Sequence, residues 1–208
     1  MKTWLQLLLA CLIPSVLMIS PARAQFVTYT FESSQFPNLA HSPFLNKTPD
    51  IGLPTFTASF ASSPNPTAFT VGSVRPNLAF SGQNLMDTSA PGTFDTMSIS
   101  LSMPVTDVQL DFALFSPGRL ELHSSVGTAT GLTGSSSQGG SLSFHSGTGL
   151  TQFDLLGFDS NNQPTLLAID NLQLTLVPEP RTVPLILLGL GLWCVRMRGS
   201  GGHRSNRF

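Results

Sequence analysis

The apolar residues between positions 25 and 177 tend to recur at every second position, which is the period of a β-strand with one buried face. The clearest example is the segment 97–103, where Met, Ile and Leu alternate with serine, so one face is apolar and the other carries hydroxyl groups. Pro104 is expected to end this strand, and the alternation resumes over 108–114. A third alternation follows the turn signal Ser116-Pro117-Gly118. Residues 97–126 are therefore predicted to form three successive antiparallel strands.

Weaker alternation predicts further strands on both sides of this region. A first strand is expected over 26–32, whereas 33–54 contains four prolines and no sustained period and is expected to be a long surface loop. The segment 127–140 is either a flexible loop or a weak edge strand, and Asp159 to Pro164 is expected to be a turn. Other strands are expected at 55–61, 68–74, 142–144, 153–155 and 166–177, the last with a bulge at Asp170-Asn171 because Ile169 is out of phase with Leu172, Leu174 and Leu176.

Many short strands without a helix between them predict an all-β fold, specifically an antiparallel β-sandwich with a jelly-roll-like topology. The exported domain is expected to span residues 25–176 of the 208-residue chain, between an N-terminal signal peptide and a single C-terminal transmembrane helix. Both cysteines, Cys11 and Cys194, lie outside this domain, which therefore has no disulfide and no thiol for catalysis or metal binding.

The N-terminal segment has the three parts of a signal peptide. Lys2 precedes an apolar core over 5–19, and Ala22-Arg23-Ala24 supplies the small residues that signal peptidase requires. Residues 1–24 are therefore expected to be removed, with cleavage between Ala24 and Gln25. An uncleaved N-terminal helix is the alternative interpretation.

The C-terminal segment combines a proline-bracketed glutamate, a short apolar run and arginines. Pro178-Glu179-Pro180 is expected to be extended, because proline disfavours helical geometry in the residue before it. The run 182–195 carries no charge and is shorter than the about twenty residues that span a bilayer. The basic residues that follow favour retention of this end in the cytoplasm, and they are Arg196, Arg198, Arg204 and Arg207.

These features in this order resemble the PEP-CTERM sorting signal of Gram-negative bacteria. The resemblance implies that the chain is a substrate of exosortase, with Pro178, Glu179 and Pro180 as the recognised motif and Arg196 and Arg198 as the basic flank. Residues 177–200 would then be the signal with its transmembrane helix, and 201–208 the basic cytoplasmic tail. The protein would be anchored in the inner membrane before processing and would then reach the cell surface or an exopolysaccharide matrix. A plain C-terminal anchor with a coincidental Pro-Glu-Pro is the alternative.

Charge is distributed unevenly along a chain whose net charge is −1. Residues 25–177 carry three basic and ten acidic residues, whereas five arginines and no acid follow Pro180. An acidic domain repels phosphate backbones, so nucleic acid is excluded as a partner.

Chemistry-bearing residues are sparse in the exported domain, and no cofactor or enzyme activity is expected. A triad of Ser, His and Asp built on His123 or His145 is compatible with the spacing, but no nucleophile-elbow or metalloprotease motif is present. Calcium ligands are a second hypothesis, although turn chemistry explains the same residues better. The candidate calcium ligands are Asp154, Asp159, Asn161, Asn162, Asp170 and Asn171.

Sugar binding by stacking is disfavoured, because the domain contains no tryptophan and Tyr29 is its only tyrosine. Recognition of sugars by Asn, Asp and Gln side chains in loops stays open. The sequence therefore predicts an exported surface or matrix protein that is structural or associated with exopolysaccharide. A carbohydrate-binding module of jelly-roll type is the alternative, and a hydrolase is a third, weaker hypothesis.

Overall fold

The computed structural model describes residues 24–73, 80, 82–88, 95–134 and 138–177. Residues Ala24–Val177 form one compact unit with its own apolar core, so we treat this unit as a domain that folds by itself. The predicted signal peptide before Ala24 and the predicted sorting signal after Val177 lie outside the described residues. No helix in the described segments is long and apolar enough to cross a membrane.

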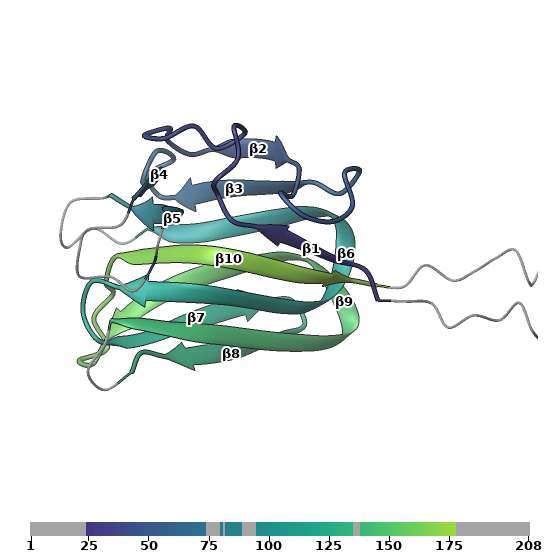
Figure 1. The fold of residues 1–208 in the computed structure, drawn as a ribbon. Helices are drawn as coiled ribbons and strands as arrows, with labels where there is room; N and C mark the ends of the chain where they lie inside the picture. The colour runs from purple at the N-terminus through teal and green to yellow at the C-terminus, as the bar shows by residue number, and fades with distance from the viewer. Residues whose placement is uncertain (1–23, 74–79, 81, 89–94, 135–137, 178–208) are drawn as a thin grey trace, which may run out of the picture. The chain divides into compact units, whose positions relative to one another are not determined.

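The described part of the domain is built from β-strands, as the alternation of apolar residues predicted (Figure 1). The ten strands belong to one antiparallel sheet with the order β4-β5-β10-β6-β9-β7-β8, in which β1 also pairs with β10, and β3 pairs with β2 and β6. Their bounds are β1 Phe26–Tyr29, β2 Phe44–Lys47, β3 Ala58–Ser63, β4 Phe69–Ser73, β5 Gln83–Asp87, β6 Thr96–Leu114, β7 Gly118–Ser124, β8 Gly127–Leu132, β9 Gly139–Asp159 and β10 Leu167–Leu176.

The two longest strands, β6 and β9, divide the sheet into two layers. The first half of β6 pairs with β3 and with the second half of β9, whereas its second half pairs with β10 and with the first half of β9. We call β1, β4, β5, β10 and the ladder between the second half of β6 and the first half of β9 the first layer. The second layer contains β2, β3, β7, β8 and the other halves of β6 and β9. Both layers contribute to one apolar cluster.

Pro104 lies at the point where β6 passes from one layer to the other. The register of the β6–β9 ladder shifts on both sides of Val105, next to this proline. A proline cannot donate a ladder hydrogen bond, so it is tolerated at an irregularity, where the strand changes direction and continues. The prediction that Pro104 ends the strand is therefore wrong.

The predicted run of three successive antiparallel strands is also wrong. β6 and β7 are neighbours in sequence, but β9 lies between them in the sheet and pairs with both. The strands predicted at 142–144 and 153–155 are two parts of the single strand β9. The strand order depends on the pairing of β9 with β6 and β7. The alternation of apolar residues within one segment shows which face is buried but does not show which strand is the neighbour.

Several local predictions are confirmed and one is partly wrong. The expected loop 33–54 contains the short strand β2, whereas 127–140 does contain the edge strand β8. The predicted bulge is present, because the β10–β6 register shifts between Asp170 and Gln173. Asn171 has a φ of 48°, which is a left-handed conformation that asparagine adopts more readily than most residues.

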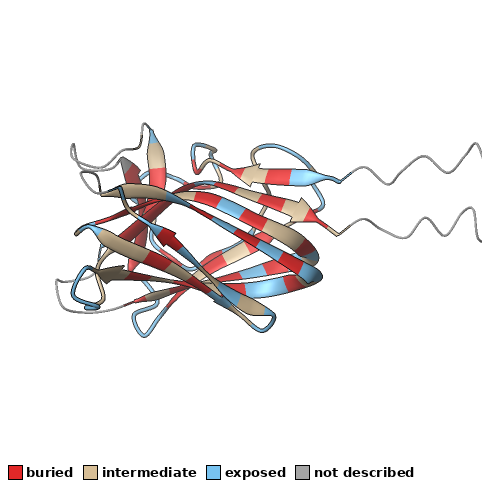
Figure 2. Cartoon of the chain, turned by 90° about the horizontal axis from the view of Figure 1, so that it is seen from below, coloured by how far each residue is buried: buried red, intermediate tan, exposed pale blue. Residues whose placement is uncertain are grey.

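The core is apolar at the positions that face inward from each strand, and Figure 2 shows buried and more exposed residues alternating along the strands. Its aromatic part is formed by five residues with ring centroids 5.1–6.3 Å apart: Tyr29, Phe31, Phe36, Phe44 and Phe60. The Tyr29 hydroxyl donates a hydrogen bond of 2.8 Å to the carbonyl of Lys47, so the polar end of this buried ring is satisfied. Burial raises the pKa of Tyr29 well above its usual range.

The two ends of the domain lie side by side. The backbone N–H of Leu176 donates a hydrogen bond of 2.7 Å to the carbonyl of Gln25, and β1 pairs with the end of β10. Gln25, the residue expected to become the mature N-terminus, is therefore adjacent to the last residues before the Pro-Glu-Pro segment.

Candidate functional site

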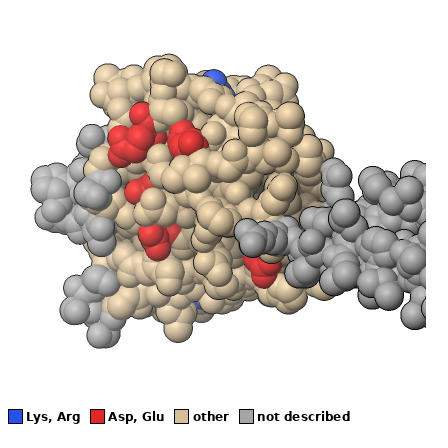
Figure 3. All heavy atoms as spheres, turned by 45° about the vertical axis from the view of Figure 1, so that its right-hand side comes forward, with Lys and Arg blue, Asp and Glu red and all other residues tan. Residues whose placement is uncertain are grey.

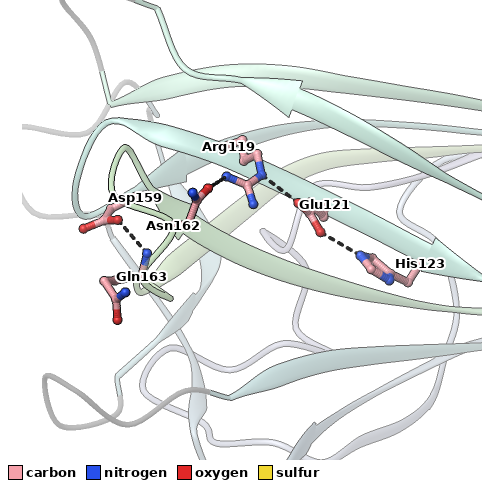
Figure 4. A network of polar contacts seen from close by, with 6 residues as sticks. All are labelled: Arg119, Glu121, His123, Asp159, Asn162 and Gln163. Carbon is pink, nitrogen blue, oxygen red and sulfur yellow. Dashed lines mark hydrogen bonds and ion pairs between the residues drawn. The ribbon is translucent and has the colours of Figure 1, made fainter.

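A row of charged side chains lies on the outward face of β7 in the second layer. Leu120 and Leu122 are buried, so the period of two turns Arg119, Glu121 and His123 to the other face. Glu121 Oε1 lies 2.6 Å from Arg119 Nε, and its Oε2 lies 2.8 Å from His123 Nε2 (Figure 4). These hydrogen bonds, first from Arg119 and then from His123, lower the pKa of Glu121. The carboxylate therefore holds two cationic or donor groups in fixed positions.

The first of these groups is also held by the turn after β9. The Arg119 guanidinium donates a hydrogen bond to the side-chain oxygen of Asn162 and lies 4.7 Å from the ring centroid of Phe158 (Figure 4). Because the guanidinium covers this ring, Phe158 is not free to stack on a ligand. The arginine is consequently a fixed donor at one end of the row.

Neighbouring strands extend the row into a wider face. Across the β7–β9 ladder His123 pairs with Asp154, and across the β6–β9 ladder Ser98 pairs with the same aspartate. The Ser98 hydroxyl donates a hydrogen bond of 2.6 Å to Asp154. We call this surface the β7–β9 polar face. Its members are Arg119, Glu121 and His123 on β7, Gln152 and Asp154 on β9, Ser98 and Ser100 on β6, and Thr128 and Thr130 on β8.

The arrangement of these groups does not form a nucleophilic triad. The carboxylate of Asp154 lies between Ser98 and His123 in the cross-strand row, so the serine donates to a carboxylate instead of to an imidazole. A triad requires the histidine in the middle position, where it can take the hydroxyl proton. His123 is engaged by Glu121.

The second candidate histidine is engaged in the same way on the first layer. His145 Nδ1 lies 2.6 Å from Asp107 Oδ1, and this hydrogen bond lowers the pKa of Asp107. Neither imidazole has a serine hydroxyl among its described hydrogen-bond partners. The geometry therefore offers no support for the hydrolase hypothesis.

The candidate calcium ligands do not come together in one place. Asp154 lies on the β7–β9 polar face, whereas Asp159 accepts hydrogen bonds of 2.8 Å from the backbone N–H groups of Asn161 and Gln163 in its own turn. The turn interpretation of this segment is confirmed. Asp170 and Asn171 lie in the first layer. Among the described residues, no group of three or more His, Cys, Asp or Glu side chains is arranged to hold a metal ion.

Tyr29 is fully buried, so it is not available to stack on a sugar ring. The exposed rings of Phe26 and Phe115 are not part of the β7–β9 polar face, so recognition of sugars by that face relies on its hydrogen-bonding groups. The hydrogen-bond donors and acceptors of the β7–β9 polar face lie on strands. Sequence analysis instead considered Asn, Asp and Gln in loops, and one of these loop residues, Asn162, accepts a hydrogen bond from Arg119.

The structure also contains a second polar group, which surrounds Asp170 in the first layer. Asp170 was named from the sequence as a candidate calcium ligand, but its neighbours Asn84, Asp111 and Glu32 were not. Asp170 is 5% exposed. The side chain of Asn84 is fully buried, and within the described part of the domain neither of its amide atoms has a hydrogen-bond partner. Burial raises the pKa of Asp170 to about 6, and the charges of Asp111 and Glu32 add to this effect. These residues come from distant segments, so no local motif marks them.

Comparison with known proteins gives similar structures without assigning a family. No family model matches the chain, and no curated protein matches it. A mutant of the family 29 carbohydrate-binding module CBM29-2, complexed with mannohexaose, is similar with a TM-score of 0.40 and 11% identity over 74% of this chain and 92% of that one. Two other CBM29-2 mutants give TM-scores of 0.38 and 0.33 at 10% and 15% identity, covering 74% and 58% of this chain and 93% and 91% of theirs. At these values the likeness assigns neither a family nor a ligand to this chain.

Proposed function

We propose that residues 24–177 form an exported, non-enzymatic domain of jelly-roll-like topology that binds extracellular polysaccharide through the β7–β9 polar face. The observation that carries the proposal is the hydrogen-bonded row of Arg119, Glu121 and His123 on the outward face of β7. Thr128 and Thr130 of β8 flank the row on one side, and Phe158, Leu156 and Asp154 of β9 flank it on the other. Sugar hydroxyls act as donors and acceptors, so a flat array that presents both kinds of group is complementary to them.

The expected strength of binding follows from the lack of a free aromatic platform among the described residues of the β7–β9 polar face. Phe158 is covered by Arg119, so binding by this face has to rely on hydrogen bonds. Each hydrogen bond to a sugar replaces one to water, and the net gain is only about 1 kcal/mol. We therefore expect weak binding to each sugar unit. A long polymer that offers many units in succession raises the overall affinity through multivalency.

The binding test uses the purified domain 24–177 on an array of neutral and acidic bacterial polysaccharides, followed by titration calorimetry with the best ligand. The replacements His123→Ala and Gln152→Ala are each expected to weaken binding about tenfold, which corresponds to about 1.4 kcal/mol. Gln109→Ala is the matched control, because Gln109 is an exposed strand glutamine in the first layer, whereas Gln152 is one in the second.

Two outcomes of this experiment would contradict the proposal. One is that no polysaccharide binds, including the exopolysaccharide of the producing cell. The other is that Gln109→Ala reduces binding while His123→Ala and Gln152→Ala do not, which would move the site to the other layer.

The C-terminal segment supplies the delivery part of the proposal. The N-terminal signal would lead to export and cleavage by signal peptidase, the segment 182–195 would hold the protein in the inner membrane for a time, and exosortase would process it near Pro178-Glu179-Pro180. The domain would then reach the cell surface or the extracellular matrix, where its polysaccharide ligand is present.

Replacing Glu179 with alanine is expected to leave export intact and to block this processing, because the motif loses its only charge while both prolines stay. Intact mass and cell fractionation in a host that contains exosortase measure the result, with Thr182→Ala as a control that preserves the motif. Release of the Glu179→Ala protein at the wild-type level would show that the motif is not the processing signal.

A further inference from the structure

Asp170 lies in a row of polar residues that crosses the first layer. Its direct partner on β6 is Asp111, so two carboxylates face each other across a ladder, which is destabilising when both are charged. Asn171 donates a hydrogen bond of 3.0 Å to Asp111, but an amide does not neutralise a charge. Asp170 itself accepts a 2.7 Å hydrogen bond from the backbone N–H of Asn171.

Asn84 occupies the next position of the row, on the other side of β10. In the β10–β5 ladder Ile169 pairs with Leu85, and both of these side chains point into the core. The residues one step further along each strand, Asp170 and Asn84, therefore point to the opposite face. Asn84 is 0% exposed, and its Oδ1 and Nδ2 both lack a hydrogen-bond partner among the described residues. Burying an amide without a hydrogen-bond partner costs free energy. The unpaired Asn84 side chain therefore indicates that its oxygen has a partner other than the protein, such as a bound ion.

Glu32 reaches this place from the segment that follows β1. Its Oε1 accepts a hydrogen bond of 2.8 Å from the backbone N–H of Gln83, the residue before Asn84, so the carboxylate lies against the start of β5. Glu32 is exposed, whereas Asp170 is buried. The group therefore combines one exposed carboxylate with two buried polar side chains.

The two basic side chains that the structure describes, Lys47 and Arg119, contact other groups than Asp170, Asn84 and Glu32. Lys47 lies 5.8 Å from the ring centroid of Phe36 in the aromatic part of the core, and Arg119 is paired with Glu121 in the second layer. Figure 3 shows acidic side chains gathered on one face of the domain. The charges of Asp111 and Glu32 both act unfavourably on ionised Asp170, which is the electrostatic situation that a bound cation relieves.

We propose that Glu32, Asn84 and Asp170 bind a divalent cation of the calcium class. Two carboxylates and one amide oxygen are the hard oxygen ligands that Ca²⁺ prefers, and backbone carbonyls and water complete such sites. Binding would provide a partner for the Asn84 oxygen and would bring β5, β10 and the segment after β1 together around one ion. Because the site lies in the first layer, it is independent of the polysaccharide proposal, and each can fail without the other.

The experiment measures thermal unfolding of the domain 24–177 after treatment with EDTA and removal of the chelator, with calcium chloride, with magnesium chloride and without either. Calcium at ~100 times its Kd is expected to raise the unfolding midpoint by about 5 °C or more. Titration calorimetry on the same sample is expected to give a stoichiometry of one. Magnesium is expected to give a smaller rise, because it demands a stricter geometry and dehydrates reluctantly.

Two variants and one control make the site assignment specific. Asp170→Asn is expected to abolish the response to calcium and yet to raise the midpoint in EDTA, because it removes one of two facing carboxylates. Glu32→Gln changes an exposed side chain, so it should fold normally and weaken calcium binding about tenfold or more. Glu121→Gln removes a carboxylate from the second layer and should keep the full response.

The proposal is overturned if wild type shows no calcium-dependent shift and no heat of binding. It is equally overturned if the shift is undiminished in both Asp170→Asn and Glu32→Gln, or if Glu121→Gln removes it. A fall of the midpoint for Asp170→Asn in EDTA would also count against it, because it would mean that the carboxylate stabilises the metal-free domain.

Discussion

Replacement of Phe60 by alanine is expected to lower the free energy of unfolding by about 3–5 kcal/mol, the largest loss that we anticipate for a single side chain. The Phe60 ring is 1% exposed, and its centroid lies 5.5 Å from that of Tyr29, 5.6 Å from Phe31 and 5.8 Å from Phe36. Removing the ring leaves a cavity and also removes three edge-to-face contacts. Because small domains have only about 5–15 kcal/mol of stability, part of the protein is expected to be unfolded at 37 °C.

Urea denaturation followed by circular dichroism measures this effect, with Phe26→Ala as the matched control. Phe26 lies on β1 and is 52% exposed, so its removal should cost about 1 kcal/mol or less. Similar losses for the two variants would mean that the aromatic part of the core does not hold the first strand, the segment after it and β3 together.

Replacement of Gly118 by alanine is expected to cost about 3 kcal/mol, although it adds a single methyl group. A Cβ at this position would lie 2.0 Å from the carbonyl oxygen of Phe158 and 2.7 Å from the Cα of Asp159. Both are backbone atoms of β9, and Gly118 pairs with Asp159 at the start of the β7–β9 ladder. The clash can be relieved only by separating the two strands, which would also displace Arg119.

The same glycine-to-alanine change at position 147 is the control. A Cβ on Gly147 would meet no atom within 4 Å, so Gly147→Ala should be neutral or stabilise the domain by up to about 1 kcal/mol through the unfolded state. Thermal unfolding of both variants provides the comparison. Equal midpoints would contradict the close approach of the two strands at Gly118.

The sequence allowed prediction of which face of each strand is buried, but it did not allow prediction of which strands are neighbours. Met97, Ile99, Leu120 and Leu122 all point inward as the alternation indicated, because burial of one face imposes a period of two. The pairing of β6 with β9 joins residues far apart in sequence, and no local pattern reports it. Pro104 was misjudged for the same reason, since the register shift that accommodates it involves the partner strand.

The two candidate sites differ in the same way. Arg119, Glu121 and His123 follow one another at the strand period, so their common face was visible in the sequence once the segment was predicted to be a strand. The group of Glu32, Asn84 and Asp170 depends on the pairing of β5 with β10 and on the path of the chain after β1. Asn84 lies beside Leu85 and Met86 in a short apolar stretch, where nothing in the local sequence marks its amide as a ligand.

The hydrogen bond between the carbonyl of Gln25 and the N–H of Leu176 has a mechanical consequence under the proposed export route, in which both ends of the domain would be attached. Since the first and last strands leave the sheet at neighbouring points, a pull on either end would be applied to the same edge of the domain, and cutting one tether would transfer no load across the core. The domain would then be released in two separate cuts, in either order, without a change in its strand pairing.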